Sequence, residues 1–269
     1  MTSNNNQQSI TNYQPLLDFA QELAWQAGHI TLGYFNTGVR ADLKSDNTPV
    51  TLADRRAEEQ MRTLIAQHFP DHGILGEEYG SINEDADWRW ILDPIDGTKS
   101  FVQGVPLYGV LVGLEHRGVP VVGVCYLPAL DEMVAAAQGL GCRWNGRRAQ
   151  VSAVTQMADA AVVHNNVATM EAHGRGAAYE RIRAATRLQR GWGDCYGHVL
   201  VATGRAEVML DPIMNVWDCA ALLPILQEAG GSFTDWQGTP TIHGNEAVST
   251  NGTLLAEVVR LIEGPDAAE

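Results

Sequence analysis

The sequence predicts an α/β protein, and three observations lead to that prediction. Apolar residues recur at helical spacing near the start of the chain. From Leu107 to Met133 the pattern changes to that of strands, and from about Ala160 a second mixed half follows without a break in composition. At 269 residues the chain can bury a sizeable core, as one large domain or as two closely packed halves.

The first elements are helices. Apolar side chains recur at helical spacing over residues 16–30, and Gly33 follows them, which predicts one amphipathic helix. A polar turn over residues 44–49 then leads to a second helix. Thr51 and Asp54 have the spacing of a capping box, in which a hydroxyl and an acid three residues later bond to each other's backbone amides.

Strands and further helices follow. The dipeptides Arg117-Gly118 and Asn145-Gly146 predict hairpin turns between strands. In the second half we expect a strand over residues 206–210, a helix from Asp218 to Ala229 and a last helix over residues 254–262.

The segment over residues 90–101 carries the strongest functional signal. It is an apolar strand that is followed by two carboxylates, Asp93 and Asp96. Pro94 removes a backbone donor and Gly97 allows a φ that other residues resist, so we expect the strand to end at Asp93 and the chain to turn sharply. Two aspartates that face one point repel each other unless a cation neutralises them, and hard oxygen ligands suit Mg²⁺, Mn²⁺ or Ca²⁺.

The residues after this turn are suited to an anion. If residues 98–101 open a helix or turn, the backbone amides of Gly97 and Thr98 face a phosphate, because a helix N-terminus favours negative charge. The alternative is a plain strand and turn in which Asp93 and Asp96 cap local amides.

Further acids stand at the ends of other expected elements. Glu77 and Glu78 follow the short apolar pair Ile74-Leu75, and Asp218 begins an apolar stretch. Each alone is ambiguous, because Asp218 could be a helix N-cap and the two glutamates a solvated pair.

Together these segments resemble the inositol monophosphatase family of metal-dependent, lithium-sensitive phosphatases. The likeness runs from about Leu16 to Ile262 and rests on three segments in the family's order and spacing: Ile74-Leu75-Gly76-Glu77-Glu78, Asp93-Pro94-Ile95-Asp96-Gly97-Thr98 and Trp217-Asp218-Cys219-Ala220-Ala221. The resemblance implies an α-β-α-β-α sandwich, a homodimer and the hydrolysis of phosphate monoesters.

The resemblance also implies a set of metal ligands. The first ion would be held by Glu77, Asp93, Asp96 and the carbonyl of Ile95, and the second by Asp93, Asp96 and Asp218. Two or three Mg²⁺ ions, or Mn²⁺ in their place, would activate an attacking water and stabilise the departing oxygen without a covalent enzyme intermediate. Glu77 thus counts as catalytic as well as metal-binding.

Other catalytic roles come from the same resemblance. Thr98 matches the residue whose hydroxyl orients the attacking water, and Asp54 matches the acid that hydrogen-bonds that hydroxyl. The alternative for Asp54 is its capping role, and both roles can hold. The amides of Gly97 and Thr98 would bind phosphate. Lys44 matches a family lysine near the metals, although a lysine in a polar loop is usually only solvated.

Within the family, the second half resembles the branch that acts on histidinol phosphate. The resemblance rests on residues 190–197, on residues 201–207 and on Asp211-Pro212. Histidinol phosphate carries an ammonium and an imidazole, so its pocket should present acids, and Asp194 and Asp211 fit that need. The alternative for Asp211-Pro212 is a turn after a strand.

Three neighbours of these acids have weaker assignments. Arg190 would hold Asp194 in a charge-assisted pair, or else lie on the surface. Trp192 and Tyr196 would flank the imidazole, or else pack in the core.

Composition excludes several other classes of partner. The formal net charge of −14 argues against nucleic acid and anionic membranes, whose phosphates need a basic surface. Residues 1–10 read as a frayed terminus without a signal peptide, and no apolar run approaches the length of a membrane span. The four cysteines show no Cys-x-x-Cys spacing, so we expect free thiols in a reducing cytoplasm.

We therefore expect a disordered segment over residues 1–10, a metal-binding half over residues 11–155 and a half over residues 156–269 that sets substrate specificity, together one compact unit. The predicted function is Mg²⁺-dependent hydrolysis of histidinol phosphate in histidine biosynthesis. Two alternatives stay open: a sister phosphatase for inositol, sugar or nucleotide phosphates, and a non-catalytic regulator that only binds metal.

Overall fold

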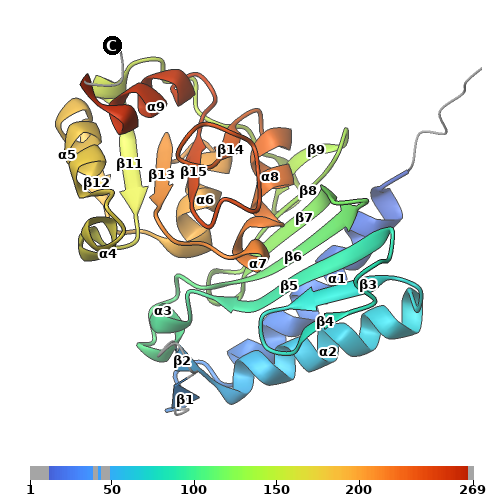
Figure 1. The fold of residues 1–269 in the computed structure, drawn as a ribbon. Helices are drawn as coiled ribbons and strands as arrows, with labels where there is room; N and C mark the ends of the chain where they lie inside the picture. The colour runs from blue at the N-terminus through green and yellow to red at the C-terminus, as the bar shows by residue number, and fades with distance from the viewer. Residues whose placement is uncertain (1–11, 39–41, 44–48, 266–269) are drawn as a thin grey trace, which may run out of the picture.

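The computed structural model describes residues 12–38, 42–43 and 49–265. Five layers stack in the order helix, sheet, helix, sheet, helix, which confirms the α-β-α-β-α sandwich (Figure 1). The helices are α1 (Gln14–Leu32), α2 (Leu52–His68), α3 (Thr98–Val102), α4 (Val167–Ala172), α5 (Gly176–Ala185), α6 (Asp194–Ala202), α7 (Val216–Cys219), α8 (Leu222–Glu228) and α9 (Leu255–Glu263). Within the described residues, no helix combines the length and apolar character that crossing a bilayer requires.

The strands form two large sheets. The larger has eight strands in the order β10-β9-β8-β7-β6-β5-β3-β4, and the smaller has five in the order β12-β11-β13-β15-β14. The strands are β1 (Asp42–Leu43), β2 (Pro49–Val50), β3 (Gly73–Gly76), β4 (Gly80–Ile82), β5 (Trp88–Asp96), β6 (Gly109–His116), β7 (Val119–Leu127), β8 (Glu132–Ala137), β9 (Gly141–Trp144), β10 (Arg147–Arg148), β11 (Ala161–His164), β12 (Leu188–Arg190), β13 (Val208–Asp211), β14 (Ser232–Thr234) and β15 (Ala247–Thr250). Within the part of the chain that the structure describes, strands β1 and β2 pair only with each other.

Three apolar cores lie between the five layers. Helices α1 and α2 cover the outer face of the larger sheet, and their apolar stripes pack on strands β5 to β8 (Figure 1). The middle core joins the larger sheet to α6, α8 and the smaller sheet. The third core lies between the smaller sheet and helices α5 and α9. The outer helices α1, α2, α5 and α9 therefore bury one face, whereas α6 and α8, which lie between the two sheets, are buried over most of their surface.

Most of the expected elements are confirmed. Helix α1 buries Leu17, Ala20 and Leu23 along its expected stripe, and Thr51 and Asp54 form the expected capping box of α2. Both hairpin turns adopt left-handed conformations: φ is 54° and 77° at Arg117-Gly118, and 46° and 75° at Asn145-Gly146. Residues 1–10 and Lys44 lie outside the described residues.

Two boundaries were wrong. Strand β5 does not end at Asp93 but continues to Asp96, with a shift of register between these residues that accommodates Pro94. The helix expected from Asp218 to Ala229 is two helices, α7 and α8. Pro224 explains the break, because it has no N–H to donate to the carbonyl four residues earlier.

Two glycines allow the junction of α7 and α8 to lie against the larger sheet. Gly113 in β6 and Gly123 in β7 stand opposite each other in register. A Cβ on Gly113 would lie 2.8 Å from the Cβ of Ala220, and a Cβ on Gly123 would overlap the carbonyl oxygen of Ala221. The sheet is therefore bare at the place where the chain enters α8, and this contact fixes the height of Asp218 above the sheet.

We expect Gly123→Ala to lower the free energy of unfolding by about 1–3 kcal/mol, because the new methyl group must displace backbone rather than a flexible side chain. Urea denaturation checks this. Gly33→Ala is the matched control, since Gly33 has an ordinary helical φ of −62° and its Cβ would lie 3.2 Å from the carbonyl oxygen of Ile30. Equal stability of the two variants would contradict the proposed contact.

Candidate active site

Glu77 and Asp93 lie side by side because β3 and β5 run parallel. Gly76 pairs with Leu92 in this register, and the amide of Glu77 donates to the carbonyl of Leu92 at 3.2 Å. Both carboxylates therefore stand at the same edge of the sheet, where the carboxyl ends of parallel strands commonly form ligand sites.

The bulge in β5 adds Asp96 to this edge. In a regular strand, side chains three residues apart point to opposite faces of the sheet. The shift of register between Asp93 and Asp96 removes that alternation, and Asp93 Oδ1 accepts a hydrogen bond from the amide of Ile95 at 2.9 Å. The bulge thus turns two carboxylates of one strand toward one point.

Asp218 completes the cluster from the opposite side. It lies in α7, and its Oδ2 accepts the amide of Asn215 at 2.7 Å in a capping box. Carboxylate oxygens of Asp93, Asp96 and Asp218 lie within 4.8 Å of one another. Glu77 lines the same cleft. This donor set of several carboxylates without nitrogen or sulfur fits Mg²⁺ or Mn²⁺.

Burial and mutual repulsion perturb these acids. Burial raises the pKa of Asp93 well above its usual value, and the charges of Glu77, Asp96 and Asp218 raise it further. Burial, then the charges of Asp194 and Asp218, also raise the pKa of Asp96. The pKa of Asp218 rises to about 7, mainly through burial. The cluster is therefore stable in its ionised form only if positive charge joins it.

The chain turns at Gly97 directly beside the cluster. Gly97 has a φ of 85°, and α3 begins at Thr98. A Cβ on Gly97 would lie 3.1 Å from both Asp194 Oδ2 and the carbonyl oxygen of Leu107, so the position has no room for a side chain. Gly97 and Thr98 line the cleft next to Asp93 and Asp96, as expected for a phosphate cradle.

The expected hydrogen bond between Asp54 and Thr98 is not formed. Asp54 Oδ2 accepts from the amide and the hydroxyl of Thr51, at 2.8 and 2.6 Å, so its carboxylate is occupied by the capping box. The hydroxyl of Thr98 donates to the carbonyl of Ile95 at 3.0 Å. The capping alternative for Asp54 is the one the structure supports.

One cleft of about 470 Å³ collects most of the expected site residues. Those that line it are Glu77, Asp93, Ile95, Asp96, Gly97, Thr98, Asp194, Asp211 and Asp218. Sequence reasoning missed Lys99, Asn165 and Trp217, which line the same cleft. Lys99 and Trp217 are sequence neighbours of Thr98 and Asp218, and this adjacency is the feature of the sequence from which their place in the cleft could have been predicted.

Asp194 and Asp211 approach the cluster from the smaller sheet. Asp211 is 3% exposed at the end of β13, and Asp194 is the first residue of α6. Burial raises the pKa of both carboxyl groups. Asn165 connects them: its Nδ2 donates to Asp211 Oδ2 at 2.7 Å, and its Oδ1 accepts from the amide of Asp194.

Arg190 does not pair with Asp194. It ends the edge strand β12, is exposed, and donates through Nη1 to the carbonyl of Gln189 at 2.7 Å. The cation that acts on Asp194 is instead Lys99, whose charge lowers the pKa of Asp194 against the larger effect of burial.

Neither expected aromatic side chain lines the cleft. Trp192 is 41% exposed, whereas Tyr196 packs at the edge of the middle core with the guanidinium of Arg205 5.8 Å from its ring. The core-packing alternative therefore holds for Tyr196. Trp217, which does line the cleft, is the aromatic residue on that wall.

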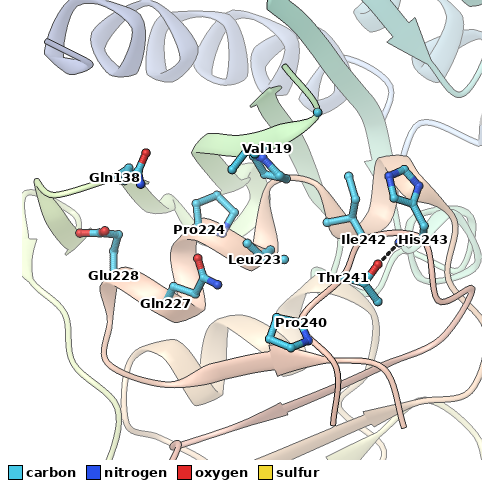
Figure 2. Close-up of a pocket in the computed structure, with 12 residues that line it drawn as sticks. Val119, Gln138, Leu223, Pro224, Gln227, Glu228, Pro240, Thr241, Ile242 and His243 are labelled. Carbon is cyan, nitrogen blue, oxygen red and sulfur yellow. Dashed lines mark hydrogen bonds between the residues drawn. The ribbon is translucent and has the colours of Figure 1, made fainter. Parts of the chain in front are cut away.

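A second cavity, of about 320 Å³, lies elsewhere and lacks this chemistry (Figure 2). It is lined by Leu223, Pro224 and Ile242 among other residues, and its one acid is Glu228. Both carboxylate oxygens of Glu228 already accept backbone amides, those of Gly139 and Gly141. The carboxylate cleft is therefore the candidate active site.

Two stacked sheets with a carboxylate cluster at the strand ends define a class of metal-dependent phosphatases. The model of the inositol monophosphatase family matches residues 12–264, and the chain belongs to this family. A histidinol-phosphatase from Chlorobaculum parvum is 45% identical over 92% of this chain and 96% of its own length. A histidinol-phosphatase from Mycobacterium tuberculosis is 38% identical over 90% of this chain and 96% of its own. The solved structure of an inositol monophosphatase from Zymomonas mobilis matches with a TM-score of 0.84 at 31% identity, covering 94% of this chain and 100% of that one.

The raised pKa values predict a pH dependence of stability after treatment with a chelator. The pKa of Asp218 is about 7 in the folded protein against 3.8 as its ordinary value, so folding favours the protonated form. This contribution to stability is complete below the unfolded-state pKa and is lost as pH rises through about 7. We expect the free energy of unfolding to fall between about pH 4 and pH 7, with no further change from this group at higher pH, in urea titrations with EDTA.

Asp218→Asn is the matched variant for this measurement, since it keeps the shape of the side chain without its charge. Its unfolding free energy should fall less steeply with pH than that of the wild type. Parallel pH profiles of the two proteins would show that Asp218 does not titrate in this range.

Proposed function

We propose that the protein is a Mg²⁺-dependent phosphomonoesterase that hydrolyses histidinol phosphate to histidinol and phosphate. One observation carries the proposal: the partly buried acid Asp194 and the buried acid Asp211 share a cleft with the candidate metal-binding cluster of Asp93, Asp96 and Asp218. The names of the two histidinol-phosphatases that match nearly the whole chain support the same substrate.

The cluster supplies ligands for at least two ions. Glu77, Asp93, Asp96 and the carbonyl of Ile95 would hold the first, and Asp93, Asp96 and Asp218 the second, with Mn²⁺ as a substitute. When bound, these ions supply an activated water and a Lewis acid for the departing oxygen. Asp93 and Asp96 each belong to both proposed ligand sets.

The protein's own groups position the ester. The amides of Gly97 and Thr98 stand where a phosphate oxygen can accept from them, at the start of α3. The hydroxyl of Thr98 lies 3.0 Å from the carbonyl of Ile95 and can instead hold the attacking water in line with the ester.

The ammonium of the substrate is assigned to Asp194. In histidinol phosphate the carbon that bears the amine is bonded to the ester CH₂, so the ammonium lies close to the phosphate. Asp194 Oδ2 lies close to Gly97, beside the amides that are proposed to bind phosphate. A Cβ placed on Gly97 would be 3.1 Å from this oxygen. A carboxylate in this place favours a cationic ester over a neutral one by a charge-assisted hydrogen bond.

A phosphate-release assay over amino-alcohol, polyol, sugar and nucleotide esters tests the proposal. We expect kcat/KM to be highest for histidinol phosphate, and Asp194→Ala to raise KM for this ester about tenfold with a smaller effect on a neutral sugar phosphate. A preference for a polyol ester would identify a sister phosphatase instead. Equal effects of the variant on both esters would remove the ammonium contact.

Asp96→Asn tests one of the two carboxylates that both proposed ions share. The amide keeps an oxygen that can accept the backbone amide of Cys195, so the fold should persist, and the loss of one negative charge relieves repulsion in the cluster. We expect turnover to fall by at least about 100-fold, measured as phosphate release at saturating Mg²⁺. Asp87→Asn, at an exposed acid paired with Arg117, is the control and should keep full activity. Unchanged turnover in Asp96→Asn would refute the role of Asp96.

A further inference from the structure

Asn165 occupies a place that the topology of the smaller sheet determines. It directly follows β11, which runs parallel to β13 with His164 in register with Leu210. The next residues along the two strands are therefore neighbours at the carboxyl edge, and these are Asn165 and Asp211. Asn165 Nδ2 donates to Asp211 Oδ2 at 2.7 Å.

The other end of the same amide reaches α6. Asn165 Oδ1 accepts a hydrogen bond from the backbone amide of Asp194. A Cβ on Gly193 would overlap the side chain of Asn165, so the approach requires glycine there. Asp194 itself has a φ of 52°, a left-handed conformation that is uncommon for residues other than glycine. The bond to Asn165 holds Asp194 in this conformation.

A neutral bridge has a consequence that a charged one would not have. The carboxamide offers one donor end and one acceptor end, so it connects the side chain of Asp211 to the backbone of Asp194 without cancelling either negative charge. An arginine or lysine in this place would neutralise the acids and repel an ammonium. An aspartate would set an oxygen against Asp211 Oδ2.

We propose that Asn165 is the positioning residue that sets the spacing and direction of the carboxylates of Asp194 and Asp211, and thereby selects a cationic amino-alcohol ester over a neutral ester of equal size. The proposal rests on the proposed function and deepens it. Asn165 acts through the two acids. It takes no part in binding or hydrolysing the phosphate group, which is assigned to the metal-binding side of the cleft.

The experiment compares two variants on two matched esters. Asn165→Ala removes both ends of the bridge, and Asn165→Leu keeps about the same size without either hydrogen-bonding end and without adding a charge. The esters are histidinol phosphate and its analogue with a hydroxyl in place of the amine. For both variants we expect KM for histidinol phosphate to rise about tenfold with kcat within about twofold, and kcat/KM for the hydroxyl analogue to change by less than about twofold.

Asn251→Ala is the control for a merely structural loss. Asn251 is 3% exposed, and its amide also bonds at both ends, to Val154 and Leu254 among others, away from the cleft. This variant should lose stability in urea titrations without changing the ratio of kcat/KM for the two esters.

The outcomes separate this proposal from the one on which it rests. A wild-type enzyme without preference between the two esters would overturn the proposed substrate, and the role of Asn165 with it. A wild-type preference that persists in both Asn165 variants, or an equal loss on both esters, would overturn the role of Asn165 alone. Loss of the preference in Asn165→Leu together with native stability supports it.

Discussion

Repulsion among carboxylates that are gathered in one partly buried cleft is the constraint on which the rest of this structure depends. Glu77, Asp93, Asp96 and Asp218 come from three separate segments, and each of the three aspartates has its pKa raised by burial and by neighbouring charges. Left to themselves these groups would separate, so rigid elements must hold them. A parallel strand pair, a bulge in β5 and the seat of α7 on the larger sheet provide that rigidity, and the apolar cores on either side of the sheet stabilise it.

The two sheets meet functionally at the start of α6. The amide of Cys195 donates to Asp96 Oδ2, and the amide of the preceding residue, Asp194, donates to Asn165. One helix end thus connects Asp96 of the carboxylate cluster to Asp194 in α6 and, through Asn165, to Asp211 in the smaller sheet. The proposed metal ligands belong to the larger sheet and to α7, the proposed ammonium ligand belongs to α6, and α6 fixes their relative position.

Local patterns in the sequence predicted the elements and the focus of the site well, because strand ends, capping boxes and hairpin turns depend on neighbouring residues. They failed where the outcome depends on distant partners. The sequence predicts that Pro94 ends its strand, whereas pairing with β6 carries the strand on to Asp96. Arg190 was expected to pair with Asp194, but its place on an edge strand directs it elsewhere, and Lys99 is the cation that acts on that acid. Asn165 was missed altogether, since only the register of β11 on β13 brings it beside Asp211.

The paired glycines beneath the junction of α7 and α8 influence the candidate active site although they lie outside it. Gly113 and Gly123 carry no functional group and do not line the cleft. The position of Asp218 nevertheless depends on them, because a side chain on either glycine would collide with Ala220 or Ala221. A side chain at either position would therefore shift Asp218 relative to Asp93 and Asp96, and would also disturb the packing of the fold. These glycines have no reactive group. The absence of their side chains nevertheless determines where the carboxylate of Asp218 lies relative to Asp93 and Asp96.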